Sequence, residues 1–225
     1  MTRRELLSAV HFVGDLNEVA LTTLEEHMRL RRFRRGQPIF TQGDPGDSLF
    51  LVASGRVKLF IENSNGEQLT ILFCDPGSCF GEMAVLDGQP RSASAEALES
   101  TEAWVVPRNA FLDLMRREPD IAIAVIAFLC SKLRTDLARI EELIFLDTYN
   151  RVGRQLVRLA TKNESGDYTV QITQEELARL VGNSREQVNR ALAGLSSLDH
   201  VSIGRGHIQI NHLDAMKRIF GKSNI

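Results

Sequence analysis

The residues best suited to chemistry stand in a short stretch near the C-terminus, from Ser184 to Leu195. If this stretch is helical, at about 100° per residue, four polar side chains share one face: Arg185, Glu186, Asn189 and Arg190. Four apolar side chains share the opposite face: Val188, Ala191, Leu192 and Leu195. Arginine can donate two hydrogen bonds to guanine, and glutamate can accept one from cytosine. The pattern therefore predicts a helix that packs through one face and reads DNA bases with the other.

A solvated charged face is the simpler alternative for this helix. Ser184 is suited to cap its N-terminus, which is compatible with either interpretation. Arg185, however, would occupy the first helical position, where the positive end of the helix dipole disfavours a cation. This unfavourable placement weakens the alternative, and we favour DNA recognition.

The surrounding elements form a helix-turn-helix pattern. Thr173 is followed three residues later by Glu176. Ser184 is followed in the same way by Gln187, so each pair can form a capping box at the start of a helix. Gly182-Asn183 supplies a tight turn between the two helices, and such a pair is the helix-turn-helix unit. We expect Thr173 and Ser184 to lie beside the DNA together with the polar face of the second helix.

A hairpin with a cationic tip follows the second helix. Two short runs, 201–203 and 207–210, flank Gly204-Arg205-Gly206. Such a hairpin is typical of a wing that lies on the phosphate backbone, and Arg205 is its candidate contact. Residues 148–225 carry 11 Lys and Arg against 7 Asp and Glu, whereas the preceding residues carry 16 against 22. A basic module on an acidic body predicts a polyanionic partner, double-stranded DNA, for that module.

Short strands and turns fill much of the first half of the chain. Alternating runs such as 48–52 and 56–61 are separated by turn signals such as Gly43-Asp44-Pro45-Gly46-Asp47. Short strands with glycine turns between them are typical of an antiparallel roll or barrel. We therefore predict a β-roll from residue 28 to about residue 106, preceded by helix within residues 1–27.

A long helical region follows the roll. Its apolar residues recur at alternating steps of three and four: Ile123, Ile126, Cys130, Leu133, Leu137, Ile140 and Ile144. A seam held for about three heptads is typical of a two-stranded coiled coil, which predicts a homodimer. The alternative is a helix lying against its own domain's core, and Val125, Phe128 and Leu129 leave room for both interpretations. Asp147 is suited to cap the next helix, and we expect the hinge between domains there.

Length and composition set the class of protein. We predict an α+β fold with a ligand-sensing β-roll domain at 1–112, a dimerisation helix and hinge at 113–147, and a winged helix-turn-helix domain at 148–225. The longest apolar stretch, Ile121 to Cys130, is too short to cross a bilayer, and no signal-like segment is evident. We therefore expect a cytoplasmic protein without membrane contact. The cysteines lack nearby histidines and an even count, which predicts buried thiols rather than disulfides or a metal site.

The order of these elements and three motifs resemble the family of the cyclic-AMP receptor protein and the fumarate-nitrate reduction regulator, the CRP/FNR family. The motifs are Gly43–Asp47 leading to Val57, Phe80–Ala84 closing with Arg91-Ser92-Ala93, and Thr173–Leu177 together with Val181–Arg190. Together they are highly specific and span nearly the whole chain. The resemblance implies a transcription regulator that dimerises, contacts RNA polymerase and is gated allosterically by a small effector. It also implies that Arg185, Glu186 and Arg190 read TGTGA-type half-sites arranged as a palindrome.

In that family the second motif binds the phosphate of a cyclic nucleotide. The resemblance implies that Gly81 offers its backbone N–H and that Glu82 bonds the ribose 2′-hydroxyl. It also implies that Arg91 and Ser92 hold the cyclic phosphate, and a short helix N-terminus with an arginine suits an anion on chemical grounds as well. A salt bridge between Glu82 and Arg91 is the plainer alternative. The candidate ligand residues of this motif are Gly81, Glu82, Met83, Ala84, Arg91 and Ser92.

The sequence departs from the cyclic-AMP-responsive members on the long helix. Those members carry Thr-Ser or Thr-Asn facing the purine, whereas the aligned positions here are Asp136 and Leu137, with Thr135 one residue earlier. An ionised aspartate only accepts hydrogen bonds, and adenine can donate one while guanine can donate two. Cyclic AMP is the first candidate effector and cyclic GMP the second, with a different ligand left open. The alternative for Asp136 is a solvated flank of the coiled coil.

Other sensors and other functions fit less well. The oxygen-sensing branch of the family uses N-terminal cysteines, and none precedes Cys74. The carbon-monoxide-sensing branch needs a haem histidine in the roll, and no histidine lies between His27 and His200. No Walker motif, metal-ligand spacing or nucleophile with a partnered histidine predicts an enzyme, and we expect no required cofactor. The remaining alternative to a gated regulator is a constitutive or differently liganded DNA-binding protein whose roll is mainly a dimer scaffold.

Overall fold

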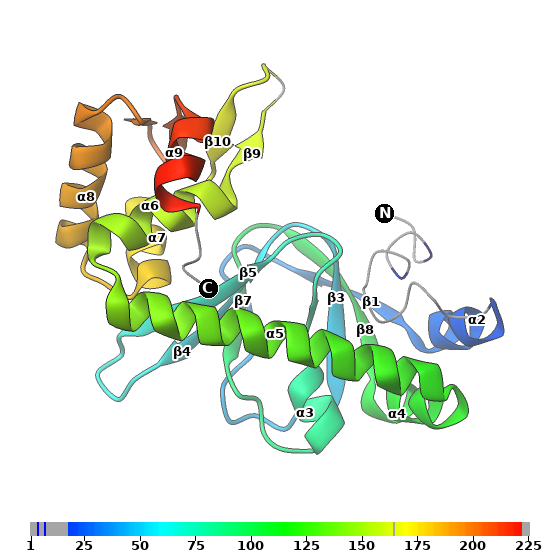
Figure 1. Ribbon diagram of the computed structural model, residues 1–225. Helices are drawn as coiled ribbons and strands as arrows, with labels where there is room; N and C mark the ends of the chain where they lie inside the picture. Colours follow the sequence, from blue (N-terminus) through cyan, green and yellow to red (C-terminus); the bar gives the residue numbers. More distant parts are fainter. Residues whose placement is uncertain (1–3, 5–6, 8–17, 164, 222–225) are drawn as a thin grey trace. The chain divides into compact units, whose positions relative to one another are not determined.

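The computed structural model describes residues 4, 7, 18–163 and 165–221. The chain divides into two compact units, Met1–Leu133 and Arg134–Ile225. The division falls inside α5 (Pro119–Phe145), the longest helix of the described residues, which Figure 1 shows as one continuous element. The domain boundaries expected after residues 112 and 147 stay predictions.

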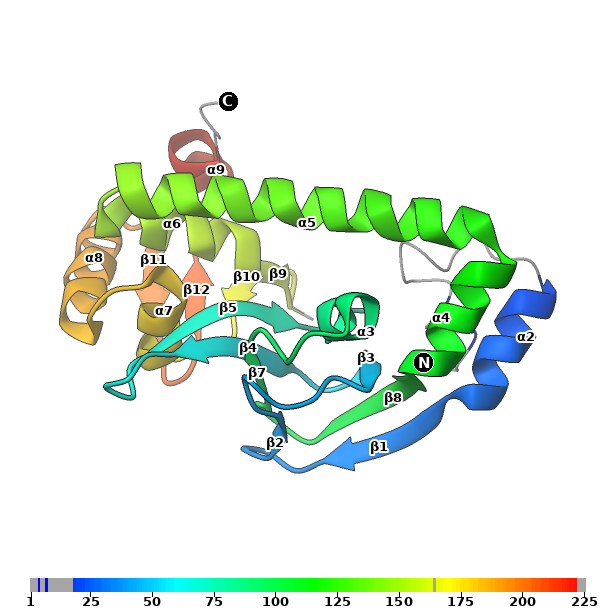
Figure 2. The ribbon, with the colours of Figure 1, turned by 90° about the horizontal axis from the view of Figure 1, so that it is seen from below.

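The first unit consists of two antiparallel sheets with flanking helices. Its elements are α2 (Glu18–His27), β1 (Arg29–Phe33), β2 (Pro38–Phe40), β3 (Ser48–Ser54), β4 (Val57–Glu62), β5 (Gln68–Cys74), β6 (Cys79–Phe80), α3 (Glu82–Asp87), β7 (Ser94–Ala97), β8 (Thr101–Pro107) and α4 (Arg108–Arg117). The strand orders are β1-β8-β3-β6 and β2-β7-β4-β5, and Figure 2 shows β4 beside β5. The arrangement confirms the predicted β-roll and the α+β class. Of the helix expected within residues 1–27, α2 is present, and most of the rest lies outside the described residues.

Strand β3 explains how one short run supports two apolar cores. Successive side chains of a strand point to opposite faces. Phe50 and Val52 therefore enter the core between the two sheets, where Phe50 lies opposite Phe80 in the β3–β6 register. Leu49 and Leu51 enter the core between the first sheet and the helices. Because both faces are covered, residues 49–52 are all apolar, and the description of the run 48–52 as alternating was wrong.

The helical region after the roll consists of two helices. Helix α4 ends at Arg117, and α5 begins at Pro119, whose fixed φ suits the first position of a helix. One face of α5 packs on the core of its own unit: Ile121 and Val125 are buried, and Phe128 and Leu129 are partly buried against them. The interpretation that this helix covers its own domain's core is therefore confirmed for that face.

The predicted heptad seam lies on a different face of α5 and is exposed. Its six large apolar residues are each between 51% and 67% exposed: Ile123, Ile126, Leu133, Leu137, Ile140 and Ile144. Cys130, the seventh seam residue, is exposed as well. Exposed apolar residues in a continuous stripe are unusual on a monomer and indicate a surface that another chain covers.

The second unit combines a group of packed helices with a small sheet. Beyond the end of α5, its elements are α6 (Thr148–Leu159), β9 (Thr161–Lys162), β10 (Tyr168–Val170), α7 (Gln174–Val181), α8 (Arg185–Ser197), β11 (Val201–Ile203), β12 (Ile208–Ile210) and α9 (Leu213–Phe220). The strands are ordered β11-β12-β10-β9 and are antiparallel. Asp147 caps α6 as predicted, because its carboxylate accepts from the Asn150 N–H at 2.8 Å. No helix within the described part of the chain is long and apolar enough to cross a membrane.

Candidate functional site

The turn before β3 is fastened to the segment that carries Arg91. The Arg91 N–H donates to the Asp44 carbonyl at 2.8 Å, and the Gly43 N–H donates to the Arg91 carbonyl at 2.9 Å. Gly46 lies against α3 so closely that a Cβ there would stand 2.1 Å from the Cβ of Ala84. Glycine at position 46 is therefore required for α3 to pack on this turn. The backbone bonds from the turn then place Arg91 beside the start of α3.

The Arg91 side chain is 4% exposed and binds the backbone at two points. Its Nη1 donates to the Gly81 carbonyl at 2.8 Å, and its Nη2 donates to the Ser48 carbonyl at 2.7 Å. Gly81 has φ 77°, and a Cβ there would stand 2.7 Å from the same Nη1. Glycine thus serves both the left-handed conformation and the close approach of the guanidinium.

Aromatic rings form the wall behind this guanidinium. The Arg91 Cζ lies 4.3 Å from the centre of the Phe40 ring and 5.7 Å from that of Phe50. Burial lowers the pKa of Arg91, although the nearby charges of Asp47, Asp44 and Glu82 act against that shift. Arg91 makes no ion pair with any described residue, and its Nε is buried without a hydrogen-bond partner. The guanidinium is therefore a buried cation that is only partly compensated.

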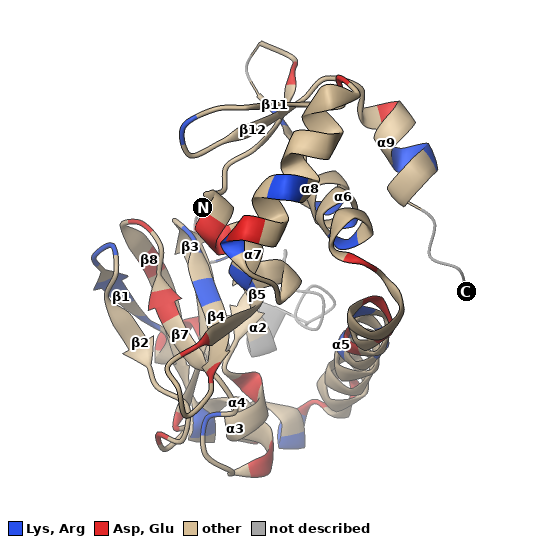
Figure 3. Cartoon of the chain, turned by 90° about the vertical axis from the view of Figure 1, so that its left-hand side faces the viewer, with Lys and Arg blue, Asp and Glu red and all other residues tan. Residues whose placement is uncertain are grey.

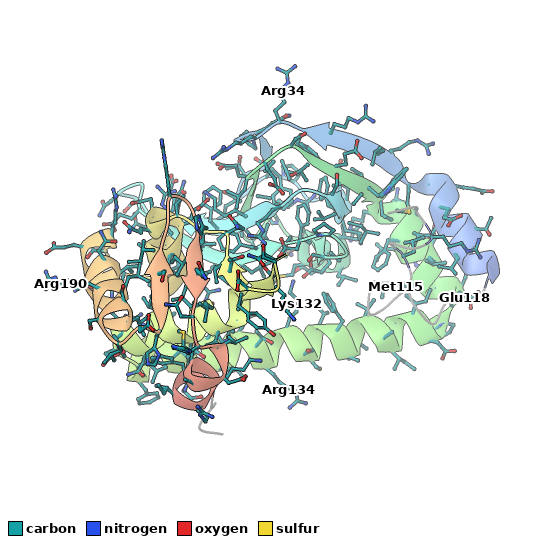
Figure 4. All side chains as sticks on the ribbon, turned by 90° about the horizontal axis from the view of Figure 1, so that it is seen from above. Arg34, Met115, Glu118, Lys132, Arg134 and Arg190 are labelled. Atoms are coloured by element: carbon teal, nitrogen blue, oxygen red, sulfur yellow. The ribbon has the colours of Figure 1, made fainter. Side chains whose placement is uncertain are left out.

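Glu82 is the second buried charge of this region, and its partner is Lys132 on α5. Glu82 is 3% exposed, and the Lys132 Nζ donates to its Oε1 at 2.7 Å. Figure 4 shows Lys132 extending from one side of α5 while Arg134 extends from the other. The alternative of a Glu82–Arg91 salt bridge is therefore wrong. Arg91 binds carbonyls, and a helix that is distant in sequence supplies the cation for Glu82.

Sequence reasoning did not identify Lys132, although a signal was present. On a helix at about 100° per residue, Lys132 falls on the same face as Val125, Phe128 and Leu129, the face that packs on the core. A cation on a core-covering face needs a buried anion. Burial tends to lower the pKa of Lys132, but the charge of Glu82 and its hydrogen bond, with smaller contributions from two thiols, together raise it. The lysine is therefore held in its charged form.

The other members of the predicted ligand motif surround these two charges. Ala84 is buried, whereas Met83 and Ser92 are exposed, and the Ser92 hydroxyl lies 3.7 Å from the Met83 sulfur. Thr135 and Asp136 lie on α5 beyond Arg134, in the second unit, and their role as base contacts stays a prediction.

The two helices of the predicted helix-turn-helix are α7 and α8, and their starts differ. Thr173 and Glu176 form the full capping box at α7. Ser184 caps α8 through a bond from the Gln187 N–H at 3.3 Å, but the expected second capping box is not formed. The reason is that the Ser184 N–H is already bound by the Asn183 side chain at 3.0 Å.

The two faces of α8 are separated as the sequence predicted. Its apolar face is buried: Val188, Ala191, Leu192 and Leu195. Arg185, Glu186 and Arg190 are exposed, and Arg190 and Glu186 form an exposed salt bridge with each other. Such a surface pair contributes little to stability, so both side chains are available to a partner. The Asn189 side-chain oxygen, in contrast, is buried and has no hydrogen-bond partner among the described residues.

The predicted wing is the hairpin of β11 and β12. Ile203 pairs with Ile208, and Arg205 is exposed in the turn between them, where Figure 3 shows the cationic tip. The second unit therefore presents arginines at the start of α8 and at the tip of the hairpin. Within the described ranges, no group of three or more His, Cys, Asp and Glu side chains is placed to hold a metal ion.

Two family models match the two parts of the chain. Residues 30–118 match the cyclic nucleotide-binding domain, and residues 150–219 match the Crp-like helix-turn-helix domain. The first segment contains the buried Glu82 and Arg91, and the second contains α7, α8 and the hairpin.

Known proteins are similar over most of the chain. The cyclic AMP receptor protein of Thermus thermophilus is 38% identical over 193 residues, which are 86% of this chain and 88% of that protein. A CRP-like cAMP-activated global transcriptional regulator of Mycobacterium tuberculosis is 30% identical over 219 residues, 95% of this chain and 98% of that protein. The solved structure of a CRP/FNR-family transcriptional regulator, also from Thermus thermophilus, is 30% identical, with a TM-score of 0.71, and covers 86% of this chain and 99% of that one.

Proposed function

The chain belongs to the CRP/FNR family of DNA-binding transcription regulators, and from this membership we propose that it is a homodimer whose DNA affinity is set by a cyclic nucleotide. Cyclic AMP is the first candidate effector and cyclic GMP the second, because both relatives described above are named for cyclic AMP. The DNA site is a palindrome of TGTGA-type half-sites. The regulator requires no other cofactor and acts in the cytoplasm.

The buried Arg91 is the observation that carries the effector site. A buried cation without a paired anion is costly. Arg91 has only carbonyl partners, and its Nε has none. A cyclic phosphate would supply the missing negative charge and an acceptor for Nε, with the Ser92 hydroxyl and the Gly81 N–H beside it. Glu82 would accept from the ribose, and Thr135 and Asp136 are the candidates for contact with the base.

The exposed seam on α5 supports the homodimer. Seven positions at heptad spacing leave one apolar stripe uncovered along the helix. A second copy of the same stripe is its natural partner, because a two-fold axis brings like positions together in a parallel coiled coil. Such a dimer matches a palindromic DNA site, since each recognition helix then reads one half-site.

The exposed residues of the second unit support DNA binding. In this proposal Arg185, Glu186 and Arg190 read base edges, while Arg205 binds the phosphate backbone. Thr173 and Ser184, which are exposed, and Asn189, whose side-chain oxygen is buried, would be secondary contacts. Recognition helices present their first turns to the major groove, and α8 carries its arginines there.

The contact with RNA polymerase is also part of this proposal. Strand β1 and the turn after it carry five arginines: Arg29, Arg31, Arg32, Arg34 and Arg35. Arg32 pairs with Glu102, whereas Arg34 and Arg35 make no side-chain ion pair with any described residue. This cationic strip lies on an otherwise acidic unit and suits an acidic surface of the polymerase.

Calorimetric titration with cyclic AMP and cyclic GMP tests the effector. We expect one saturable site per chain, at which Arg91 holds the cyclic phosphate, with cyclic AMP bound more tightly than cyclic GMP. Saturating effector should also tighten binding to a palindromic DNA duplex with two inverted TGTGA half-sites. Absence of heat with both cyclic nucleotides, or equal DNA affinity with and without them, would contradict the gating.

A constitutive regulator with a scaffold roll is the second candidate, and one observation favours it. Glu82 is paired with Lys132 and Arg91 binds two carbonyls, so both side chains have partners within the protein itself. Arg91→Ala separates the two candidates in titrations of the palindromic duplex. A gated regulator loses its response to the nucleotide, whereas a scaffold keeps the same DNA affinity. Arg32→Ala, which removes an exposed arginine of the same unit, is the matched control and should keep the response in full.

A further inference from the structure

A buried ionic cluster joins the last turns of α5 to α6. Glu142 is 5% exposed and lies in the second unit. Its Oε1 accepts from the Arg154 Nη1 at 3.2 Å, and its Oε2 accepts from the Arg158 Nη1 at 3.0 Å. The Arg158 Nη2 donates to Oε1 as well. Both carboxylate oxygens are thus bound by arginines from the next helix.

The salt bridges cross the joint at which the sequence predicted a hinge. Only Leu146 and Asp147 separate α5 from α6, and the Leu146 N–H still donates to the Glu142 carbonyl at 3.1 Å. A bidentate arginine–carboxylate pair fixes both distance and orientation. The cluster therefore opposes rotation between the end of α5 and the start of the DNA-binding helices.

Two further arginines reach the turn that precedes the recognition helix. The Arg139 Nη2 donates to the Leu180 carbonyl at 2.9 Å, and the Arg151 Nη1 donates to the Val181 carbonyl at 3.0 Å. These carbonyls belong to the last turn of α7, where the negative end of the helix dipole favours a cation. Arg139 thus connects α5 directly to the end of α7, just before α8 begins.

The opposite side of the same α5 segment carries three seam residues. Leu137, Ile140 and Ile144 are exposed and lie in the second unit. At about 100° per residue, Glu142 is turned by at least about 140° from each of them. One short helical segment therefore presents an apolar stripe outwards and a set of ionic bonds towards the helix-turn-helix.

Helix α6 passes this constraint on to the recognition helix. Val152 and Leu156 of α6 are fully buried, as are Val188 and Leu192 on the inner face of α8. Closely packed helices behave as one body because interiors are dense and deform little. Movement of the end of α5 would therefore carry α8 with it.

We propose that Glu142 is a positioning residue that locks the seam-bearing end of α5 to the helix-turn-helix through Arg154 and Arg158. Because of this lock, contact between two copies at Leu137, Ile140 and Ile144 sets the separation of the two recognition helices. The inference rests on the proposed dimer on palindromic DNA. In this proposal, Glu142 determines which half-site spacing the dimer prefers, although it contacts neither DNA nor effector.

The test compares whole and half operators with full-length protein at saturating cyclic AMP. One duplex carries two inverted TGTGA half-sites centred one helical turn apart, and a second has one half-site scrambled. Three more duplexes shift the spacing by one or two base pairs. We expect wild type to bind the whole site at least about 100-fold more tightly than the half site, as linked binding allows. In Glu142→Gln this advantage should fall at least tenfold, and the preference for one spacing should largely disappear.

Half-site affinity distinguishes positioning from folding. It should stay within twofold of wild type in Glu142→Gln, because the lock does not touch DNA. Glu141→Gln, which alters the neighbouring glutamate outside the cluster, is the matched control and should keep the wild-type advantage. If Glu142→Gln fails to fold, Arg158→Gln removes the guanidinium that binds both oxygens of Glu142 and should lower the same ratio.

The remaining outcomes overturn one idea or both. An unchanged ratio of whole-site to half-site affinity in the variants overturns the positioning role of Glu142, even if both affinities fall together. A wild-type protein without any advantage on the whole site contradicts the proposed dimeric regulator and the lock that depends on it. Sedimentation of each variant checks that dimers persist, and a variant that becomes monomeric would place Glu142 in dimer stability instead, which also overturns the lock.

Discussion

Among the described residues, each unit contains one buried glutamate, and the two are held in opposite ways. Glu82 in the roll has a single lysine bound at one oxygen, and that lysine side chain is 29% exposed. Glu142 in the second unit has both oxygens bound by two arginines. Arginine binds a carboxylate in a fixed planar geometry, whereas the lysine ammonium is a mobile point charge.

The difference corresponds to what each carboxylate can still do. An ionised carboxylate has about four acceptor positions, and Glu82 keeps most of them available for a ribose hydroxyl. Three of the acceptor positions of Glu142 are already used by hydrogen bonds from Arg154 and Arg158. A buried carboxylate with one hydrogen bond from a lysine can still bind a ligand. A buried carboxylate with three hydrogen bonds from arginines is suited to hold two helices in a fixed orientation. In our proposals, the same residue type therefore serves effector sensing in one unit and positioning in the other.

The largest expected contrast is in stability. Glu142→Ala leaves Arg154 and Arg158 without their anion, and we expect a loss of about 3 kcal/mol in the free energy of unfolding. Glu82→Ala should cost only about 1 kcal/mol, because Lys132 can return to water. Urea unfolding can separate the units: Trp104, the single tryptophan, reports the roll, and the two tyrosines, Tyr149 and Tyr168, report the second unit. Equal losses of unfolding free energy in Glu142→Ala and Glu82→Ala would contradict the difference that we infer between the two glutamates.

The next contrast is between the affinity for operator DNA and the affinity for cyclic AMP. Arg185→Ala removes a side chain that we propose reads bases, so we expect operator affinity to fall by about 1–3 kcal/mol, roughly 5- to 150-fold. The affinity of DNA-free protein for cyclic AMP should not change, because Arg185 is not among the residues that we propose contact the effector. Fluorescence anisotropy and calorimetry measure the two affinities. Arg218→Ala removes the same charge from an exposed position on α9, and an equal loss of operator affinity there would reduce Arg185 to a general electrostatic role.

The smallest contrast is in the response to alkali. Burial raises the pKa of Cys74 in the roll to about 12, with Glu82 and Asp75 adding to the shift and Lys132 opposing it. In the unfolded chain the thiol ionises at its ordinary pKa. The stabilisation is therefore complete below about pH 9 and is lost as the pH rises towards 12, by about 1.4 kcal/mol per pH unit for this thiol.

Urea unfolding followed by Trp104 at pH 7.5, 9 and 10 measures this slope. Cys74→Ala lowers stability at every pH because it leaves a small cavity, but it should reduce the slope. A smaller slope should persist, because burial also raises the pKa of the Cys79 thiol in the same unit. The second unit contains no cysteine and should show no such thiol-dependent slope. A slope that is unchanged in Cys74→Ala would assign the alkaline loss to other groups.

Local patterns in the sequence predicted a large part of both units. The faces of α8, the cap at Thr173 and the seam on α5 each depend on residues within a few turns of one another. Periodicity and capping are local rules, so a short stretch of sequence is sufficient to apply them. One failure was a local competition at Ser184, where the Asn183 side chain binds the N–H that a second capping box requires.

The sequence by itself determined the family, the recognition helix and the motif that contains Glu82 and Arg91. Only the tertiary structure decided which charges are paired. Lys132 stands 50 residues from Glu82, and Arg158 stands 16 residues beyond Glu142 across a break between helices. No periodic rule spans such separations, because the pairing depends on which helix faces pack together. The fold thereby turned one glutamate into a candidate ligand contact and the other into a joint.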